Sequence, residues 1–286
     1  MKTSPLISQV LKTSDLRLKV SLLNEELLEF QNVTGHFSFL DQPGRSASII
    51  EKFRGPKEKI STPVGQARLL HELCNIELQA MELALRTYLE YPTAPVQFRL
   101  ELAHLAQQES EHLLLCLNEL ERRGYQFGHW PIHLQLWQAV SEEDSLLDRL
   151  LIVHRYLEGS GLDASAKILT KLKGVGDKSL TQIVDRIFQD EMVHVQFGSR
   201  WYHSLAFDLN LDPEVDFVDR LNKLYPRLPK RLEKSDENLS QKAGFTALEI
   251  KELNKIKAQQ LEQLSGSQDR DLRSAQVKSA QKIELF

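Results

Sequence analysis

The sequence has few cysteines, no long apolar run and no excess of charge of one sign, and each absence excludes a class of protein. Only two of its 286 residues are cysteines, Cys74 and Cys116, and they form no Cys-x-x-Cys pair. This excludes a disulfide scaffold and is typical of buried thiols in a reducing compartment. No stretch reaches the roughly 18 apolar residues of a membrane span, and residues 1–5 do not lead into an apolar leader. We therefore expect a cytoplasmic protein without a membrane partner.

The charge balance excludes a strongly basic protein. Lys and Arg total 36 against 40 Asp and Glu, which gives a formal net charge of −4. Such a chain has no general attraction to nucleic acid, so small-molecule or protein partners are weakly favoured. Basic side chains do gather in residues 220–234. Contact of this region with RNA phosphate stays open, but a solvated charged face is the favoured interpretation.

Turn residues are also few, with 13 Gly and 10 Pro. They separate long stretches in which apolar residues recur at helical intervals, without the alternation typical of strands. Start signals include Thr62-Pro63 and the pair Ser141 and Asp144. The expected long helices cover residues 63–91, 95–123, 142–171 and 178–208. Four such helices with short or moderate connections predict an all-α fold built on a four-helix bundle.

The rest of the sequence predicts additions to this bundle. Residues 1–62 are expected to form an N-terminal segment that wraps around the bundle at 63–208. Residues 209–264 predict a C-terminal extension with helical pieces that packs on the bundle. Residues 265–286 are rich in Ser, Gln, Asp and Lys and are expected to form a flexible tail.

Two Glu-x-x-His motifs indicate a metal site. Glu109 and His112 are three residues apart, as are Glu191 and His194. On a helix, side chains at this spacing project from one face about 5–6 Å apart, close enough to bind the same ion. The second motif lies on the apolar stripe that should face a core. Since burying a carboxylate and an imidazole without a partner is costly, a metal is an effective partner there.

Two lone glutamates extend the pattern. Glu77 and Glu158 each lie on an otherwise apolar helical face, near the middle of the helix, as the two motifs do. The order Glu, Glu-x-x-His, Glu, Glu-x-x-His is what a bundle supplies to a carboxylate-bridged dinuclear metal site. A third motif, Glu101 with His104, would lie roughly 12 Å from the common level and is expected to be peripheral.

Three stretches carry a resemblance to a known family. They are Leu69–Leu85, Arg155–Asp163 and Asp190–Trp201. Through them the chain resembles the ferritin-like family known as domain of unknown function 455, over most of residues 8–250. The resemblance implies a ferritin-like bundle with a di-iron or related dinuclear centre and implies no particular substrate. One departure is Asn75, where relatives usually have a histidine; it concerns a supporting role beside Glu77 and not that ligand.

These observations assign the metal site to six side chains, with no catalytic residue beyond the ligands. Mixed carboxylate and imidazole ligands favour Fe(II) or Mn(II), so two Fe ions are expected, with Mn/Fe or Mn/Mn as alternatives. Which carboxylates bridge is left open. The assigned ligands are Glu77, Glu109, His112, Glu158, Glu191 and His194.

Other residues near the motifs have two interpretations each. Asp190 is a candidate acceptor for the second nitrogen of a ligating histidine, with a surface ion pair nearly as well supported. His154 could contact the site, although a satisfied core histidine is favoured. Gly159 and Gly161 fit either a π-bulge close to the metals or plain packing contacts. A radical-forming role is conceivable for three tyrosines, but core packing is favoured for all of them: Tyr88, Tyr156 and Tyr202.

The favoured function is an oxidoreductase that uses O₂ as cosubstrate to oxidise or hydroxylate an unidentified substrate. The substrate is a small molecule or a modified nucleoside, the latter in a tRNA hydroxylase. Further expected partners are an electron donor and, as an open alternative, a second copy of the chain in a homodimer. The alternative function is a ferroxidase or iron-storage protein without an organic substrate. A metal-free helical scaffold is a third interpretation.

Overall fold

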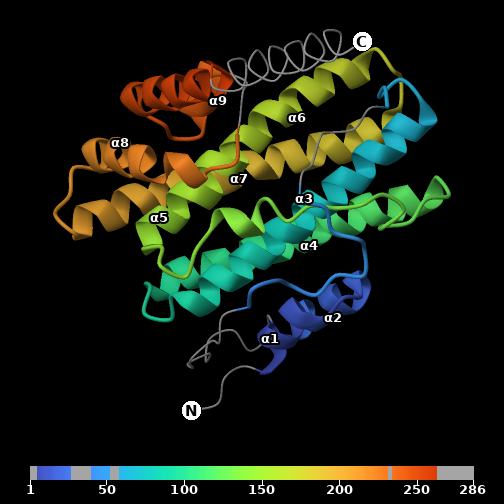
Figure 1. Ribbon diagram of the computed structural model, residues 1–286, viewed down its shortest axis with the longest axis horizontal. Helices are drawn as coiled ribbons and strands as arrows, with labels where there is room; N and C mark the ends of the chain where they lie inside the picture. The colour runs from blue at the N-terminus through green and yellow to red at the C-terminus, as the bar shows by residue number, and fades with distance from the viewer. Residues whose placement is uncertain (1–4, 27–39, 52–57, 231–233, 263–286) are drawn as a thin grey trace, which may run out of the picture.

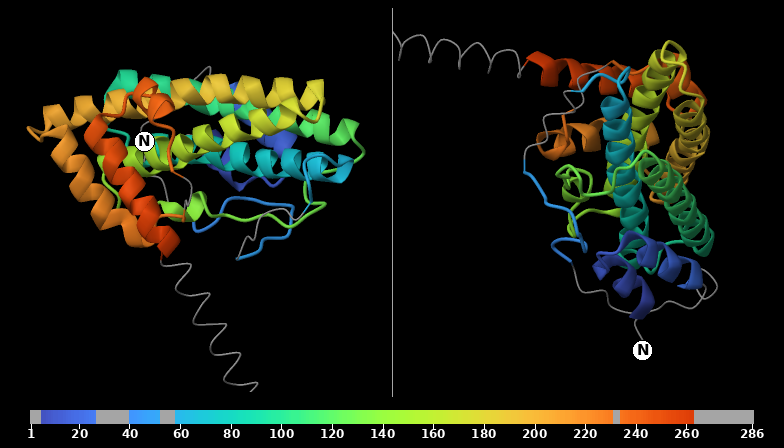
Figure 2. Two further views of the ribbon diagram at one scale, coloured as in Figure 1. Left: turned by 90° about the horizontal axis from the view of Figure 1, so that it is seen from above. Right: turned by 90° about the vertical axis from the view of Figure 1, so that its right-hand side faces the viewer.

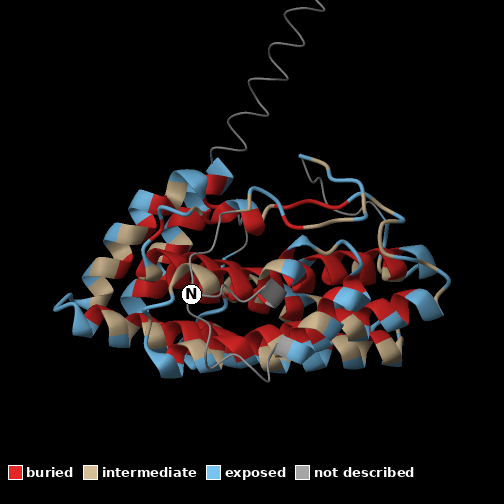
Figure 3. Ribbon diagram, turned by 90° about the horizontal axis from the view of Figure 1, so that it is seen from below, coloured by how far each residue is buried: buried red, intermediate tan, exposed pale blue. Residues whose placement is uncertain are grey.

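The computed structural model describes residues 5–26, 40–51, 58–230 and 234–262 (Figure 1). Within these ranges the chain is helical without strands, which confirms the all-α prediction. The one isolated bridge in these ranges pairs Ile49 with Ile132. Long helices lie side by side along the molecule, and the faces that they turn to one another are buried (Figures 1 and 3).

The first two long helices form where the sequence predicts them. Helix α3 covers Pro63–Glu90 and begins with the predicted cap, because the Thr62 side chain accepts a hydrogen bond from the Gly65 amide at 3.1 Å. Proline follows at the first helical position, where its missing amide hydrogen costs nothing. Helix α4 covers Val96–Arg122 and packs closely along α3. The last long helix, α7, covers Lys178–Asp208, as predicted.

The third long helix differs from the prediction in two ways. It begins at α5, Leu146–Leu150, because the reciprocal capping box is made by Ser145 and Asp148 instead of Ser141 and Asp144. Asp144 also pairs with Arg227. The helix then widens into a π-helical turn, η3, at Leu151–Leu157, before α6 continues over Glu158–Lys173.

Shorter helices from the N-terminal and C-terminal parts of the chain pack on two sides of the long helices (Figures 1 and 2). The N-terminal pair α1, Pro5–Lys12, and α2, Leu16–Glu26, contacts α3 and α4. The C-terminal pieces pack against α6 and α7: α8, Pro213–Leu224; α9, Glu237–Lys242; and a helical stretch at 247–262. Short 3-10 turns lie at η2, Trp137–Ala139, and η4, Tyr225–Arg227.

Buried ion pairs attach these outer segments to the long helices. On the N-terminal side, Lys19 and Arg45 both pair with Glu82 of α3, whose side chain has no exposed surface. On the C-terminal side, Arg155 of η3 forms a two-pronged pair with Glu249, at 2.8 and 2.7 Å. Loss of either outer segment would therefore leave a buried charge without its partner, which is costly.

Three basic residues of the region at 220–234, Arg220, Arg227 and Lys234, pair with acidic residues. Arg220 bonds Asp148 at 2.9 Å and Asp216 at 2.6 Å, and Lys234 lies 3.1 Å from Glu237. These contacts fit the solvated, salt-bridged face and leave less free charge for RNA phosphate. The predicted tail at 265–286 lies outside the described residues. No described helix has an apolar stretch long enough to cross a membrane.

Candidate metal centre

Four of the six predicted ligands meet in the core. One ligand atom from each of Glu77, Glu109, His112 and Glu191 lies within 4.8 Å of the others, and all four residues are buried. They come from α3, α4 and α7, so helix packing brings together residues that are far apart in the sequence. The described part of the chain therefore contains a possible metal-binding site of three carboxylates and one imidazole.

The fifth predicted ligand, His194, adjoins this group. Its Nδ1 atom lies 3.0 Å from Oε1 of Glu109 and 3.9 Å from Oε1 of Glu191. On the other side, Oε2 of Glu109 lies 3.4 Å from Nδ1 of His112. Glu109 therefore stands between the two imidazoles, which are 6.0 Å apart between ring centroids, and turns one oxygen to each.

The outer nitrogen of each histidine is held by the opposite helix. His112 of α4 has its Nε2 atom 3.0 Å from Oδ2 of Asp190 on α7. His194 of α7 has its Nε2 atom 3.2 Å from Oε1 of Gln108 on α4. Both partner atoms are acceptors, so each Nε2 carries a hydrogen and donates it. In the neutral tautomer each Nδ1 then has a lone pair directed at the carboxylates, as a metal ligand requires.

Of these two partners, the sequence indicated Asp190 and missed Gln108. Asp190 directly precedes Glu191, and Gln108 directly precedes Glu109. In both motifs, the residue before the glutamate therefore reaches the histidine of the other motif. The sequence therefore contained one signal for Gln108, its position directly before Glu109. That signal can be used only when α4 and α7 are known to be neighbours. Asp190 also pairs with Arg186 at 2.6 Å, so both interpretations offered for it apply at once.

Glu158, the sixth predicted ligand, lies beside the group with its carboxylate on His154. Nδ1 of His154 is 2.9 and 2.8 Å from the two oxygens of Glu158. Glu158 borders the same cavity as Glu77 and Glu191. After burial and Glu109, its negative charge contributes to the raised pKa of Glu191. His154 thus contacts a predicted ligand, and its other ring nitrogen is buried without a hydrogen-bond partner among the described residues.

The π-helical turn and a glycine position this pair. The amide of Glu158 donates a hydrogen bond to the carbonyl of Val153, five residues earlier. The π-helical turn η3 therefore ends directly before Glu158, a predicted ligand. Gly198 of α7 faces the turn, and a Cβ atom there would lie 2.4 Å from Cβ of His154. Only glycine lets the two backbones approach this closely. π-helical turns are frequent at functional sites because they alter the direction of a side chain.

Electrostatics show how strongly these groups interact. Burial, reinforced by Glu109, raises the pKa of Glu77 to about 7, and burial among other carboxylates raises the pKa of Glu191 well above its usual range. Burial alone would lower the pKa of His112, but Glu109 and Glu77 raise it to about 12. In the same way, His194 and His112 overcome burial and lower the pKa of Glu109. The raised pKa values of Glu77, His112 and Glu191 therefore favour bound protons, which offset the repulsion among the buried carboxylates.

The unpaired atoms of these residues are a second observation that fits a metal-binding site. Oε2 of the buried Glu191 has no hydrogen-bond partner among the described residues. Nδ1 of His194 and Oε1 of Glu109 approach to 3.0 Å without the alignment of a hydrogen bond. Buried polar atoms are usually hydrogen-bonded. Unpaired nitrogen and oxygen atoms that point toward one common position in a core are therefore what a metal-binding site would present. Their N and O donor types suit Fe, Mn or Zn.

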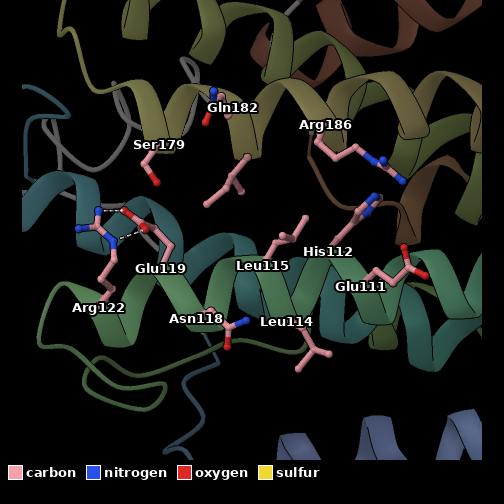
Figure 4. A pocket seen from close by; sticks show the side chains of 11 residues that line it. Glu111, His112, Leu114, Leu115, Asn118, Glu119, Arg122, Ser179, Gln182 and Arg186 are labelled. Atoms are coloured by element: carbon pink, nitrogen blue, oxygen red, sulfur yellow. Dashed lines mark hydrogen bonds and ion pairs between the residues drawn. The ribbon is translucent and has the colours of Figure 1, made fainter.

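A surface groove of about 750 Å³ leads to the rim of this group (Figure 4). It runs between α4 and α7, with His112 at one end near Arg186 and with Glu119 paired to Arg122 at the other. His112 itself is only 1% exposed. The groove therefore brings solvent to the side of His112 that faces Asp190. The carboxylates of the ligand group, Glu77, Glu109 and Glu191, stay buried.

Residues set aside by the sequence lie elsewhere. Glu101 pairs with Arg200 at 2.6 Å and accepts a hydrogen bond from Trp201, so its carboxylate is engaged outside the ligand group, although it lines a surface pocket that also reaches His194. The three tyrosines considered for radical chemistry belong to the hydrophobic core. Cys74 and Cys116 are buried free thiols, and their hydrogen bond together with burial raises the pKa of Cys116. Such thiols are unreactive, as expected for small buried hydrophobes.

Comparison with known proteins places the chain in a family. The family described as "Protein of unknown function (DUF455)" matches residues 12–251. The chain belongs to this family. An uncharacterized protein of Haemophilus influenzae is 32% identical over 203 residues, which cover 68% of this chain and 70% of the relative. No solved structure matches the chain. The DUF455 match spans all six predicted ligands, and its description assigns no activity.

Proposed function

We propose that the chain is a ferritin-like dinuclear metal oxidoreductase that uses O₂ to oxidise or hydroxylate an organic substrate. The observation that carries this proposal is the position of Glu109, with one oxygen 3.4 Å from His112 and the other 3.0 Å from His194. A carboxylate between two imidazoles is the arrangement that a pair of bridged ions requires. A single-ion site would not need the second imidazole.

The six side chains divide into two halves around shared carboxylates. Glu77 and His112 would hold one ion, since their ligand atoms are 3.3 Å apart. Glu158 and His194 would hold the other. Glu109 and Glu191 lie between them and would serve both. Four carboxylates carry enough negative charge to balance two divalent cations, which removes the cost of burying either partner alone.

When bound, two Fe ions would supply the reduction of O₂ and the oxidation of substrate. The chain's own residues supply the rest. Asp190 and Gln108 orient the imidazoles through Nε2 and keep Nδ1 free. Burial of the carboxylates excludes water from the centre and strengthens every charge interaction there. The proton on Nδ1 of His112, now shared with Glu77 and Glu109, would leave as a cation enters.

Elemental analysis of protein loaded anaerobically with Fe(II) tests the proposal. We expect about two Fe per chain, because the site supplies two imidazoles and four carboxylates. Glu109→Gln should lower this to less than about one, since both halves share Glu109. The matched control is Glu101→Gln, which alters a Glu-x-x-His motif on the same helix outside the site and should leave the iron content unchanged.

Oxygenation of the loaded protein then separates the functions. An absorption change that appears with O₂ in wild type and is lost in Glu109→Gln supports oxygen chemistry. Wild-type protein that binds no iron, manganese or zinc would refute the dinuclear site and favour the metal-free scaffold. Assembly into a cage-sized particle that accumulates oxidised iron would favour the ferroxidase or storage alternative.

A further inference from the structure

A partly open cavity of about 140 Å³ adjoins the candidate metal centre. Its walls come from α3, η3, α6 and α7, and three of the predicted ligands form its polar end: Glu77, Glu158 and Glu191. The histidine ligands do not line it. A molecule in this cavity would therefore meet the centre on its carboxylate face.

Small residues on α6 create the space. Ser160, Gly161 and Ala164 recur at helical intervals along the face that borders the cavity. At Gly161 an added Cβ would meet no atom within 4 Å, so the glycine opens onto free volume. The neighbouring Gly159 differs, because a Cβ there would contact Phe245 at 3.7 Å. Of the two glycines noted in the sequence, Gly161 borders the cavity and Gly159 packs against Phe245.

The cavity connects the surface with the carboxylates. Ile76 of α3, which is 38% exposed, and the exposed Ala164 of α6 form its outer part. Deeper walls are aliphatic, with buried Leu83 and Val153. Such an opening gives a ligand a path to the centre that does not require any helix to unfold.

The lining also defines the chemistry of the ligand. Among the described residues, no Lys, Arg or His lines the cavity. A carboxylate or phosphate placed inside would have no cationic side chain to pair with. Without metal it would face three glutamates, and with two divalent ions bound the four carboxylates would leave no net positive charge, so an anion inside would be costly in both states. The volume is close to that of an apolar cavity of about 150 Å³ that accommodates benzene in another protein. A group of about six non-hydrogen atoms fits.

We propose that this cavity is the substrate site and that it accepts an uncharged, mainly aliphatic group of about six non-hydrogen atoms. The role as substrate site rests on the proposed oxidoreductase function, whereas binding of such a group does not. A substrate larger than this would place only an uncharged aliphatic end inside. Its polar part would remain at the surface, near Ile76 and Ala164.

Saturation-transfer NMR titrations of the full chain with 1-hexanol and with hexanoate test the proposal. We expect hexanol to bind and hexanoate at pH 8 to bind at least about tenfold more weakly, because its charge has no partner in the cavity.

Gly161→Leu should fold, since its Cβ has room and leucine favours a helix. It should weaken hexanol binding at least about tenfold by filling the space of two or more methylenes. Thr170→Leu, on an exposed part of α6 outside the lining, is the matched control and should bind hexanol as wild type does.

Equal binding of hexanol and hexanoate, or undiminished binding to Gly161→Leu, would overturn the proposal. Iron content measured on the same samples separates this inference from the proposed function. Selective hexanol binding without iron binding would leave the cavity as an apolar binding site and refute the oxidoreductase. Iron binding without hexanol binding would refute the cavity site alone.

Discussion

At the scale of single residues, the candidate centre is a set of groups that cost stability. Glu191 is buried among other carboxylates, and burial raises its pKa far above that of a free glutamate. One of its oxygens is unpaired among the described residues. A core gains nothing from such a residue unless a cation binds it.

We therefore expect Glu191→Gln to have opposite effects on metal binding and stability. The variant should lose iron, because a shared carboxylate is missing. In EDTA-treated protein it should raise the free energy of unfolding by about 1–3 kcal/mol, because the charge that burial disfavours is gone. Urea unfolding curves measure this, with Glu101→Gln, expected within about 0.5 kcal/mol of wild type, as the control. A metal-free variant less stable than wild type would show that Glu191 is a structural residue.

Residue chemistry was also the part of the site most accessible from sequence. The spacing of Glu109 with His112, and of Glu191 with His194, identified groups that the fold brings together. His154 and Glu158 are four residues apart, so the spacing allowed their contact but could not show that Glu158 turns its carboxylate to His154. Nor could it reveal Gln108, whose contact crosses from α4 to α7.

At the scale of elements, the position of the site depends on how closely η3 approaches α7. Sequence patterns located three long helices within a residue or so of their observed ends, because Thr62-Pro63 and Asp177 are strong start signals. They offered a π-bulge at Gly159 and Gly161 as one interpretation but did not place the π-helical turn at Leu151–Leu157, since its apolar residues continue the helical pattern. The close contact at Gly198 arises from tertiary packing, which a local pattern does not contain.

Two glycine substitutions test this packing with opposite expected signs. Gly198→Ala would place Cβ 2.4 Å from Cβ of His154 and should lower the free energy of unfolding by about 1–3 kcal/mol. It should also reduce iron content by displacing His154 from Glu158. Gly161→Ala meets open space and should raise stability by about 0.5–1 kcal/mol. Urea unfolding measures both, and equal effects of the two changes would refute the packing argument.

At the scale of the whole molecule, buried ion pairs connect the outer segments to the helices that carry the centre. Arg155 directly follows His154 in η3 and is fully buried against Glu249. Its guanidinium also lies over the rings of Phe217 and Phe245, each 4.5 Å from the ring centroid. The C-terminal pieces therefore form part of the support of the π-helical turn.

This connection predicts a pH dependence of stability. Burial would raise the pKa of Glu249, but hydrogen bonds from His203 and Arg155 outweigh it and lower the pKa to about 2. Because the folded pKa lies below the unfolded value of about 4.3, the stabilisation is complete above that pH and is lost as pH falls towards 2. It amounts to about 3 kcal/mol.

The stability difference between wild type and Glu249→Gln should therefore be constant from pH 7 to about 5 and shrink towards pH 3. Urea unfolding at each pH measures it, with Glu237→Gln as the exposed control. A difference that does not change with pH would mean that the Glu249 charge is not what stabilises the contact.

The two histidines differ in the group that holds the outer nitrogen across α4 and α7. Asp190 is kept ionised by His112 and Arg186, which lower its pKa despite partial burial, whereas Gln108 is neutral. The imidazole beside the anion is the more electron-rich of the two. Any ions held at Nδ1 of the two histidines would therefore have unequal imidazole ligands, the stronger one from His112 and the weaker one from His194.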